Sequence, residues 1–494
     1  MKRSKFSLSY YKMLSCNQGE LVPIGLTEVL PGDTMQQATN AFIRVAPLLS
    51  PVMHPVEAKI HHWFVPHRLV WDEWENFITG GPNGVSTPTF PTIDMPASTG
   101  AAIGSLADYL GVPTGVANLQ VSALPFRGYQ LIFNEFYRDQ DLVSEAVVST
   151  ASGADTTTST SIKNAAWEKD YFTSARPFEQ KGTAVTIPLT GNAPVTITRK
   201  NNAAGSGAWL AGTNTVYTGT GNVSTSAAGN VQVGANQIMI NNANGLEGTA
   251  DLSNVTAVDV NDLRLALALQ RYKEARARYG SRYVEYLRYL GVKSSDARLQ
   301  RPEYLGGGKQ TIQFSEVLQT AEGTDPVGEM RGHGIASMRS NRYRRFFEEH
   351  GYVFSFLVVR PKSVYAQGLP RTWNRRVKED FWQRELEHIG QQEVLNKEIY
   401  APSATPNGVF GYQDRYDEYR RMESSIAGEF RTSLNYWHMA QIYAAAPALN
   451  ASFVTAVPTP RIYADQASDQ LYVMARHSIQ ARRLVAKTGH SYIY

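Results

Sequence analysis

Four histidines in the N-terminal part of the chain are the first candidates for a chemical site: His54, His61, His62 and His67. His61 and His62 are adjacent within Val56–Val65, a stretch that predicts a β-strand, so their side chains should point to opposite faces and cannot share a metal ion. The chain contains no Cys-x-x-Cys or His-Glu-x-x-His pattern that would support a zinc site. We therefore interpret the four histidines as structural, hydrogen-bonded residues and expect neither a metal nor another cofactor.

A glycine run followed by a lysine is similar to a phosphate-binding loop. A Walker motif needs its first glycine farther upstream and a serine or threonine directly after the lysine, whereas Gln310 follows Lys309 here. We interpret Gly306–Gly308 as a flexible turn. The single cysteine, Cys16, has no evident activating base, and scattered carboxylate pairs are common on protein surfaces. Because no motif argues for catalysis, we predict that the protein is not an enzyme.

Cations and aromatic rings gather at both ends of the chain, and this mixture can bind nucleic acid. Cations contact phosphates, and rings stack on exposed bases. Residues 1–19 form one such segment, and basic residues follow a strand expected at Leu471–Val473. On the sequence alone, we favour a solvated, partly disordered terminus as the interpretation of residues 1–19. The candidate nucleic-acid contacts are Lys2, Arg3, Lys5, Lys12, Arg476, Arg482, Arg483 and Lys487.

The composition indicates a globular protein of low charge. The chain has 494 residues, of which 43% are hydrophobic and 19% charged, and its formal net charge is +4. With so small an excess of cations, any contact with nucleic acid must come from a local patch. One cysteine excludes an internal disulfide framework. No apolar stretch has the length of a signal-peptide core or a membrane helix, so we expect a soluble protein with no membrane insertion.

The pattern of apolar residues predicts a mainly β fold. Val56–Val65 and Gly351–Val359 have few polar positions, so each should be a central strand that is covered on both faces. Several short strands are expected between Glu20 and Leu49, separated by turn signals such as Pro31-Gly32-Asp33. Antiparallel strands at such short intervals are typical of a sandwich or jelly roll.

Helical periodicity predicts four helices within this β framework: Val70–Phe77, Leu124–Val148, Asn261–Tyr289 and Phe430–Ala446. The stretch Asn261–Tyr289 is basic and amphipathic, which suits a nucleic-acid or membrane-surface element. It equally suits a surface or inter-subunit helix whose arginines pair with carboxylates, and we favour this second interpretation.

A long segment in the middle of the chain has an unusual composition. No Asp, Glu, Lys or Arg occurs from Asn201 to Leu246, where Gly, Asn, Ala, Ser and Thr dominate. Such a segment can be a disordered linker. It can also be a compact β excursion at the surface, because Trp209 and Tyr217 give it apolar groups to bury. We favour the ordered excursion, with strand-prone pieces such as Val231–Val233.

Several of these stretches resemble the major capsid protein of the Microviridae, small bacteriophages with single-stranded DNA, and most closely its gokushovirus branch. The resemblance covers nearly all of the chain outside residues 150–165 and 195–252. The segments that carry it are IHHWFVPHRLVWDEWENFITGG (60–81), LPFRGYQLIFNEFYRDQDL (124–142), WEKDYFTSARPFEQKG (167–182), SDARLQRPEYLGGGK (295–309) and VFGYQDRYDEYRR (409–421).

The resemblance implies a structural protein of the virion that is assembled in the cytoplasm of a bacterial host. Residues 1–494 would form one capsid domain, an eight-stranded antiparallel jelly roll with long insertions that contain helices. Sixty copies would close into a T=1 icosahedral shell around a circular single-stranded DNA genome, with residues 1–19 as a basic arm on the inner wall. Further implied partners are an internal scaffolding protein, minor virion proteins and a host surface receptor.

The low-charge segment has a counterpart in this family, which carries a variable insertion between jelly-roll strands. The resemblance implies that residues 183–258 form a protrusion at each threefold axis. It identifies no individual receptor contact, and Trp209 and Tyr217 are our candidates for receptor-facing residues. Two other classes of protein remain as alternatives: an extracellular carbohydrate-binding or carbohydrate-cleaving β protein, and a sequence-independent single-stranded DNA-binding protein. The first would call for a signal peptide, and the second for a larger positive charge.

Overall fold

The chain divides into two compact units in a computed structural model. One unit comprises Met1–Lys181 and Glu274–Tyr494, and the other is Gly182–Lys273. The structure describes residues 3–183, 185, 195–199, 223–225, 231–233, 236–237, 246–250, 260–279, 300–321, 323 and 326–487. Within these ranges the protein is mainly β, and all strand pairs of its sheets are antiparallel.

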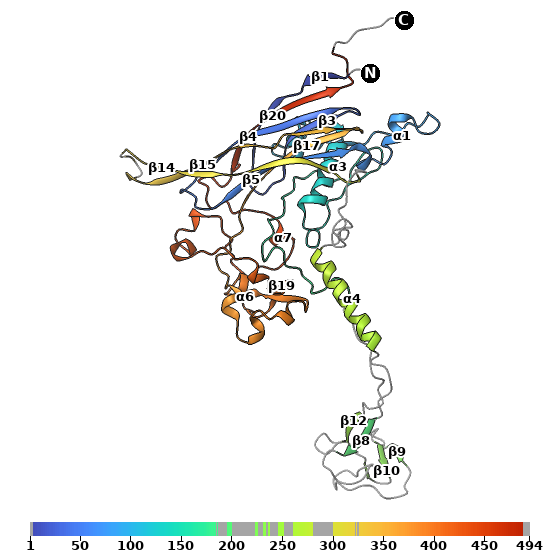
Figure 1. The fold of residues 1–494 in the computed structure, drawn as a ribbon, viewed down its shortest axis with the longest axis vertical. Helices are drawn as coiled ribbons and strands as arrows, with labels where there is room; N and C mark the ends of the chain where they lie inside the picture. The colour runs from blue at the N-terminus through green and yellow to red at the C-terminus, as the bar shows by residue number, and fades with distance from the viewer. Residues whose placement is uncertain are drawn as a thin grey trace. The chain divides into compact units, whose positions relative to one another are not determined.

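The larger unit is built on two sheets (Figure 1). The first sheet has the strand order β1-β20-β4-β15-β14, while β2 also pairs with β20 and β16 also pairs with β4. Its strands are β1 (Ser4–Ser7), β2 (Tyr10–Cys16), β4 (Thr34–Val45), β14 (Gln313–Leu318), β15 (Met330–Arg339), β16 (Tyr343–Phe346) and β20 (Leu471–Arg483).

The second sheet has the order β13-β5-β17-β3. Its strands are β3 (Val22–Val29), β5 (Val56–Pro66), β13 (Glu303–Thr311) and β17 (Gly351–Pro361). The predicted central strands are confirmed, because β5 and β17 pair with each other in the middle of this sheet. Apolar side chains on both faces of these two strands are buried. One face packs against the first sheet, and the other packs against helices and loops.

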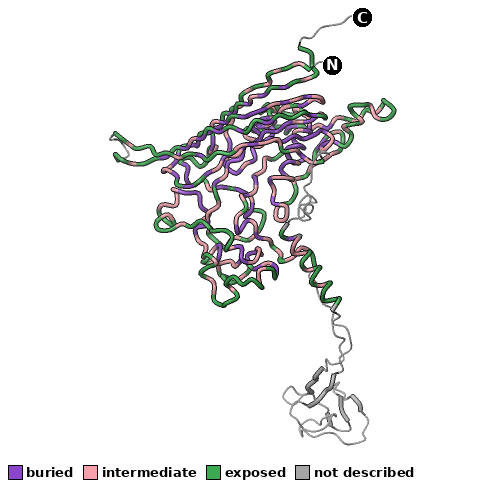
Figure 2. Tube along the Cα trace, in the orientation of Figure 1, coloured by how far each residue is buried: buried purple, intermediate pink, exposed green. Residues whose placement is uncertain are grey.

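The core between the sheets explains why they stack. One cluster of buried side chains joins Ile43 and Val473 of the first sheet to Ile60 and Leu357 of the second. Figure 2 shows the buried part of the trace concentrated in this layer. The architecture is therefore an antiparallel β sandwich, which is consistent with the expected capsid jelly roll.

The predicted structural role of the histidines is confirmed for two of them. His62 is fully buried between the sheets, where its ring nitrogens contact the hydroxyls of Ser355 (2.9 Å) and Ser340 (3.0 Å). His54 is buried and its Nε2 lies 2.7 Å from the carbonyl of Lys362. His61 is half-buried against the hydroxyl of Tyr137.

Helices and small sheets fill the connections of the larger unit. Its α-helices are α1 (Trp74–Thr79), α2 (Leu106–Leu110), α3 (Leu124–Ile132), α6 (Asn396–Ile399) and α7 (Ala451–Val454), and α3 continues as a π-helical turn, η2 (Phe133–Tyr137). Two small sheets pair β6 (Thr92–Asp94) with β7 (Gln120–Ser122), and β18 (Gln391–Leu395) with β19 (Val409–Asp414). Short 3-10 helices lie at His67–Leu69, Arg371–Asn374, Lys378–Asp380, Arg384–Leu386, Asp417–Tyr419, Gly428–Arg431 and Asn435–Trp437.

The described residues of the smaller unit form two short sheets. In one, β8 (Val195–Arg199) pairs with β12 (Leu246–Ala250); in the other, β10 (Val231–Val233) lies between β9 (Val223–Thr225) and β11 (Asn236–Gln237). The predicted strand at Val231–Val233 is confirmed. Helix α4 (Val260–Tyr279) crosses the boundary between the two units. Arg278 in its last turn pairs with Asp414 at 2.8 Å, as expected for a surface helix whose arginines meet carboxylates.

The N-terminal segment is ordered, contrary to the expectation of a partly disordered terminus. β1 pairs with β20 from Ser4 opposite Arg483, and β2 pairs with β20 from Tyr10 opposite His477. The N-terminal and C-terminal strands therefore lie side by side in one sheet. The sequence of either terminus alone could not predict this pairing.

The glycine run is not a turn, because Gly306–Gly308 lie inside β13. A Cβ atom on Gly307 would come within 2.3 Å of the carbonyl oxygen of Ile60, and one on Gly308 within 2.7 Å of that of Arg339. The glycines thus serve the close approach of neighbouring strands.

Three predicted helices differ from the structure. The helix predicted at Val70–Phe77 forms only from Trp74 to Thr79. The helix predicted at Leu124–Val148 ends with the π-helical turn at Tyr137. The helix predicted at Phe430–Ala446 does not form, and only two short 3-10 turns occur there. The guanidinium of Arg461 donates to the carbonyls of Asn435 (2.8 Å), His438 (3.0 Å) and Ala440 (2.7 Å), so a residue from later in the chain takes up acceptors that a helix would have used.

Candidate nucleic-acid interface

Strand β20 gives the first sheet two chemically different sides. From Leu471 to Arg482, alternate residues are buried toward the second sheet, and those between them project to the opposite side. Arg476 and Arg482 project to that opposite side and are exposed. We call this side, which points away from the second sheet, the basic face.

The strand register extends the basic face over four further strands. Lys5 of β1 lies opposite Arg482, and Asn40 of β4 lies between Arg476 and Arg339 of β15. Arg44 lies beside Tyr472, and Arg344 of β16 beside Gln36. The exposed cations of the basic face that have no ion pair among the described residues are Lys5, Arg44, Arg339, Arg344, Arg476 and Arg482. Arg331 of β15 is exposed on the same face but pairs with Glu329 at 2.7 Å.

The strands that carry these six cations contain no carboxylate. The sequences of β1, β2, β4, β15, β16 and β20 contain neither Asp nor Glu. The remaining strand, β14, carries Glu316, which lies opposite the buried Gly332 and so projects to the core-facing side. Within the described part of the chain, none of the six exposed cations forms an ion pair. Their charge is therefore uncompensated, and the surface suits a polyanion.

Aromatic rings lie among these cations. Tyr11 of β2 is 63% exposed, and the guanidinium of Arg476 lies 5.5 Å from the centre of its ring. The guanidinium of Arg44 lies 5.7 Å from the ring of Phe42, and Phe346 and Tyr472 are also exposed. Exposed rings beside cations can stack on the bases of a single strand while the cations contact its phosphates.

Two of the candidate cations are used inside the fold. Lys12 projects to the core-facing side, where its ammonium donates to the carbonyls of Pro23 (3.0 Å) and Tyr109, and burial lowers its pKa to about 8. Arg483 pairs with the fully buried Asp33 at 2.9 Å. Both side chains hold strands together, so we leave them out of the candidate interface.

The other candidates have different surroundings. Arg3 donates to the carbonyl of Gly32 (3.0 Å) and the hydroxyl of Thr34 (2.8 Å), at the edge of the basic face. Lys487 is exposed beyond the end of β20. Lys2 and the candidate receptor residues Trp209 and Tyr217 lie outside the described residues.

Three cations of the basic face were missing from the sequence-based candidates: Arg44, Arg339 and Arg344. The alternation of polar and apolar residues in 34–45 and 330–339 could have indicated that Arg44 and Arg339 project from a buried strand. The sequence could not indicate that β4 lies beside β20 and β15 beside β4, because these pairings join residues that are more than a hundred positions apart.

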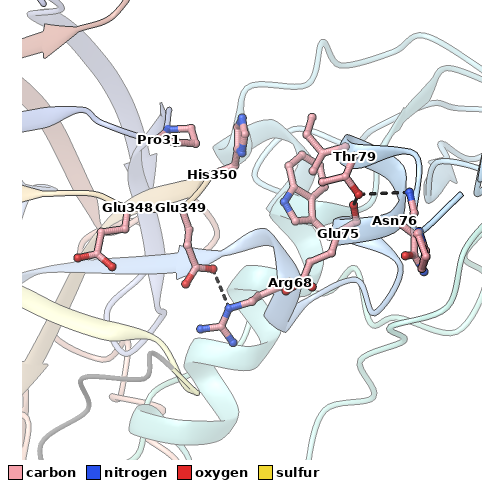
Figure 3. A pocket seen from close by; sticks show the side chains of 12 residues that line it. Pro31, Arg68, Glu75, Asn76, Thr79, Glu348, Glu349 and His350 are labelled. Carbon is pink, nitrogen blue, oxygen red and sulfur yellow. Dashed lines mark hydrogen bonds and ion pairs between the residues drawn. The ribbon is translucent and has the colours of Figure 1, made fainter. Parts of the chain in front are cut away.

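A hollow at one end of the sandwich has the opposite charge. It encloses about 590 Å³ between α1 and the turn that precedes β17 (Figure 3). Glu75, Glu348 and Glu349 line it, and Glu349 pairs with Arg68 at 2.7 Å. Excess carboxylates repel phosphate, so this hollow is a poor site for nucleic acid.

Other kinds of site find little support in the residues that the structure describes. Those residues hold no group of three or more His, Cys, Asp or Glu side chains that could bind a metal ion. They also include no helix of the length and apolar character needed to cross a bilayer.

Comparison with known proteins identifies the family. A family model described as "Capsid protein (F protein)" matches residues 1–492. The chain belongs to this family of phage capsid proteins. It is 40% identical over 480 residues to capsid protein VP1 of Bdellovibrio phage phiMH2K, covering 92% of this chain and 87% of the relative. It is 33% identical over 531 residues to capsid protein VP1 of Chlamydia phage 1, covering 92% and 89%.

A third relative supports the same assignment. Capsid protein VP1 of Spiroplasma virus 4 is 33% identical over 490 residues, covering 92% of this chain and 87% of the relative. The resemblance to gokushovirus-type Microviridae capsid proteins is thereby confirmed. As a member of this family, the protein has a structural role and is part of the virion.

Proposed function

We propose that sixty copies of this capsid protein close into a T=1 icosahedral shell around a circular single-stranded DNA genome, and that the basic face binds this DNA. Eight strands of the two main sheets would form the jelly roll that serves as the rigid wall. The observation that carries the DNA-binding proposal is the set of six exposed cations on strands that contain no carboxylate.

Binding on such a surface would be independent of sequence. The arginines and Lys5 would neutralise phosphates, and the rings of Tyr11, Phe42 and Tyr472 would accept stacked bases of any type. Strand pairing holds the cations in fixed rows, with neighbouring strands about 4.8 Å apart. A flexible single strand can follow these rows without adopting one unique path.

Other partners follow from the same proposal. Assembly in the bacterial cytoplasm would use an internal scaffolding protein, and minor virion proteins would complete the particle. The insertion, residues 183–258, would form the threefold protrusion that attaches to a host receptor, with Trp209 and Tyr217 as candidate contacts. A capsid protein acts by assembly, so no catalytic step is proposed.

The DNA-binding proposal is tested with Arg476→Gln and Arg482→Gln, two substitutions of exposed side chains. Binding of the purified chain to oligothymidine is measured by fluorescence anisotropy over a series of salt concentrations. Each lost phosphate contact should reduce the slope of log affinity against log salt by about 0.7 for single-stranded DNA, so the double variant should lose about 1.4. DNA content per particle should fall as well.

The matched control is Lys378→Gln, which removes an exposed cation outside the first sheet. It should leave both the salt slope and the DNA content unchanged. Arg483→Gln serves a different purpose, because losing the partner of buried Asp33 should lower stability rather than act through DNA. A double variant with the wild-type salt slope and DNA content would contradict the assignment of the basic face.

A further inference from the structure

The hairpin formed by β14 and β15 runs past the end of the sandwich. β15 pairs with β4 only from Ile335 to Arg339. Its residues from Met330 to Gly334 pair with β14, and on the other edge Gly332 forms a single bridge with Leu48. Figure 1 shows the two strands extending beyond their neighbours, and Figure 2 shows their far end exposed. A two-stranded ribbon without further cover is marginally stable in water.

The core-facing side of this hairpin carries an uncovered apolar strip. Gly332, Gly334 and Ala336 of β15 are buried on that side, and Met330 continues the same alternation. Leu318 lies directly opposite Met330, yet these two side chains are 49% and 41% exposed. The side of the sheet that packs into the hydrophobic core within the sandwich is therefore exposed to solvent at Leu318 and Met330.

The reason is that the covering layer ends. Phe314 still packs against the main core, and a Cβ atom on Gly332 would come within 2.2 Å of the carbonyl oxygen of Ser50, so the segment around Ser50 covers the hairpin up to that point. No residue in the described ranges covers Leu318 and Met330 in the same way. β14 is also an edge strand, with one row of backbone groups that no described strand pairs.

We propose that the core-facing side of the β14–β15 hairpin is an inter-subunit arm that docks on a second copy of this chain, an inference that rests on the proposed shell. We choose a second copy as the partner for two reasons. Capsid proteins assemble with themselves, and the apolar strip continues the side of the first sheet that packs into the core. Leu318 and Met330 would be the apolar anchors of the contact.

A second copy also offers matching chemistry. Glu316 lies on the same side of the hairpin as Leu318 and forms no ion pair within the described residues. Residues 371–389 expose Trp373, Phe381 and Trp382 together with two arginines, Arg376 and Arg384. Surfaces of this kind could cover an apolar strip that has a carboxylate beside it.

The test compares two neighbouring residues with equal exposure. Leu318 and Val317 are both 49% exposed, but Val317 lies opposite Arg331 and therefore projects to the other side of the hairpin. Leu318→Asp should reduce the yield of particles in sedimentation by at least about tenfold, since a charge would be buried at the contact without a partner. Val317→Asp should assemble as the wild type does, and both variants should keep the wild-type melting temperature as free chains.

Normal assembly of Leu318→Asp would overturn the proposal, and so would an equal loss in Val317→Asp. A second measurement is independent of yield. Cys16 is 1% exposed, so a Leu318→Cys variant offers one accessible thiol for a benzophenone maleimide. Irradiation of particles should give an adduct between two copies of the chain.

The adduct also separates this proposal from the shell proposal. Adducts only with another virion protein, or none, would overturn the inter-subunit arm. Particles that lack T=1 geometry but contain the adduct between copies would contradict the shell proposal and still support the arm.

Discussion

At the scale of single residues, two histidines sealed between the sheets should make the fold sensitive to acid. Burial lowers the pKa of His62 to about 3 and that of His477 to about 4, whereas an unfolded chain has a histidine pKa of about 6.5. Since the unfolded state takes up these protons first, the free energy of unfolding should fall as the pH drops from about 6.5 toward about 4. Each histidine contributes a slope of about 1.4 kcal/mol per pH unit in that window.

Urea unfolding of His62→Gln between about pH 8 and about pH 4.5 measures this contribution. The variant should be less stable at every pH, because one bond to Ser340 or Ser355 is lost, but its slope below about pH 6.5 should be shallower than that of the wild type. His333→Gln, at an exposed position of β15, is the matched control and should keep the wild-type slope. Identical slopes for the wild type and His62→Gln would contradict the prediction.

At the scale of elements, one arginine ties α3 to the loops around it. Arg127 is fully buried, and its guanidinium bonds to Asp155 (2.7 Å) and to the carbonyls of Val70 (2.9 Å) and Ala151 (2.9 Å). Arg127→Met should lower the free energy of unfolding by about 3–5 kcal/mol, because Asp155 would remain buried without its partner. Denaturant unfolding measures the loss.

The half-exposed pair of Arg68 and Glu349 provides the comparison for this substitution. Arg68→Met should cost about 1 kcal/mol or less, because water screens that pair. Adding Asp155→Leu to Arg127→Met should restore part of the stability, since no isolated charge then stays buried. Equal losses for Arg68→Met and Arg127→Met would show that burial does not set the strength of these pairs.

The elements also show where sequence reasoning succeeds. β5 and β17 were predictable because both faces of each strand carry mainly apolar residues, which indicates a strand that is buried on both faces. That pattern does not depend on which strands become neighbours. The prediction of a helix at Phe430–Ala446 was wrong because Arg461, which follows Asn435 by 26 residues, bonds to backbone carbonyls there. The prediction of a flexible turn at Gly306–Gly308 was wrong for a similar reason, since other strands approach this backbone so closely that only glycine fits.

At the scale of the whole molecule, the candidate interface depends on pairing that the sequence does not express. The cations of both termini were predicted, but only the pairing of β1 and β2 with β20 brings them onto one sheet. The same pairing separates Arg482, which is exposed, from Arg483, which is bound to Asp33. Neighbours in sequence thus have opposite roles, and the alternation of a strand decides which one can reach DNA.

The smaller unit, Gly182–Lys273, should be removable in large part without loss of the shell. Arg199 of β8 lies opposite Leu246 of β12 in the strand register. Cross-strand partners are close enough for a two-residue turn, so replacing residues 200–245 by Asn-Gly should close the β8–β12 hairpin without strain on the flanking chain. The larger unit holds its own core, and the shortened chain should therefore keep its melting temperature and form particles of normal sedimentation.

Attachment to host cells should be lost in the same particles, if this insertion carries the receptor contacts. Adsorption is measured as the fraction of particles removed from solution by host cells. The matched control keeps the full length and replaces Trp209 and Tyr217 by alanine, which should weaken adsorption and spare assembly. Shortened particles that adsorb as well as the wild type would assign attachment to the larger unit, and a failure to assemble would assign the insertion to the shell contacts instead.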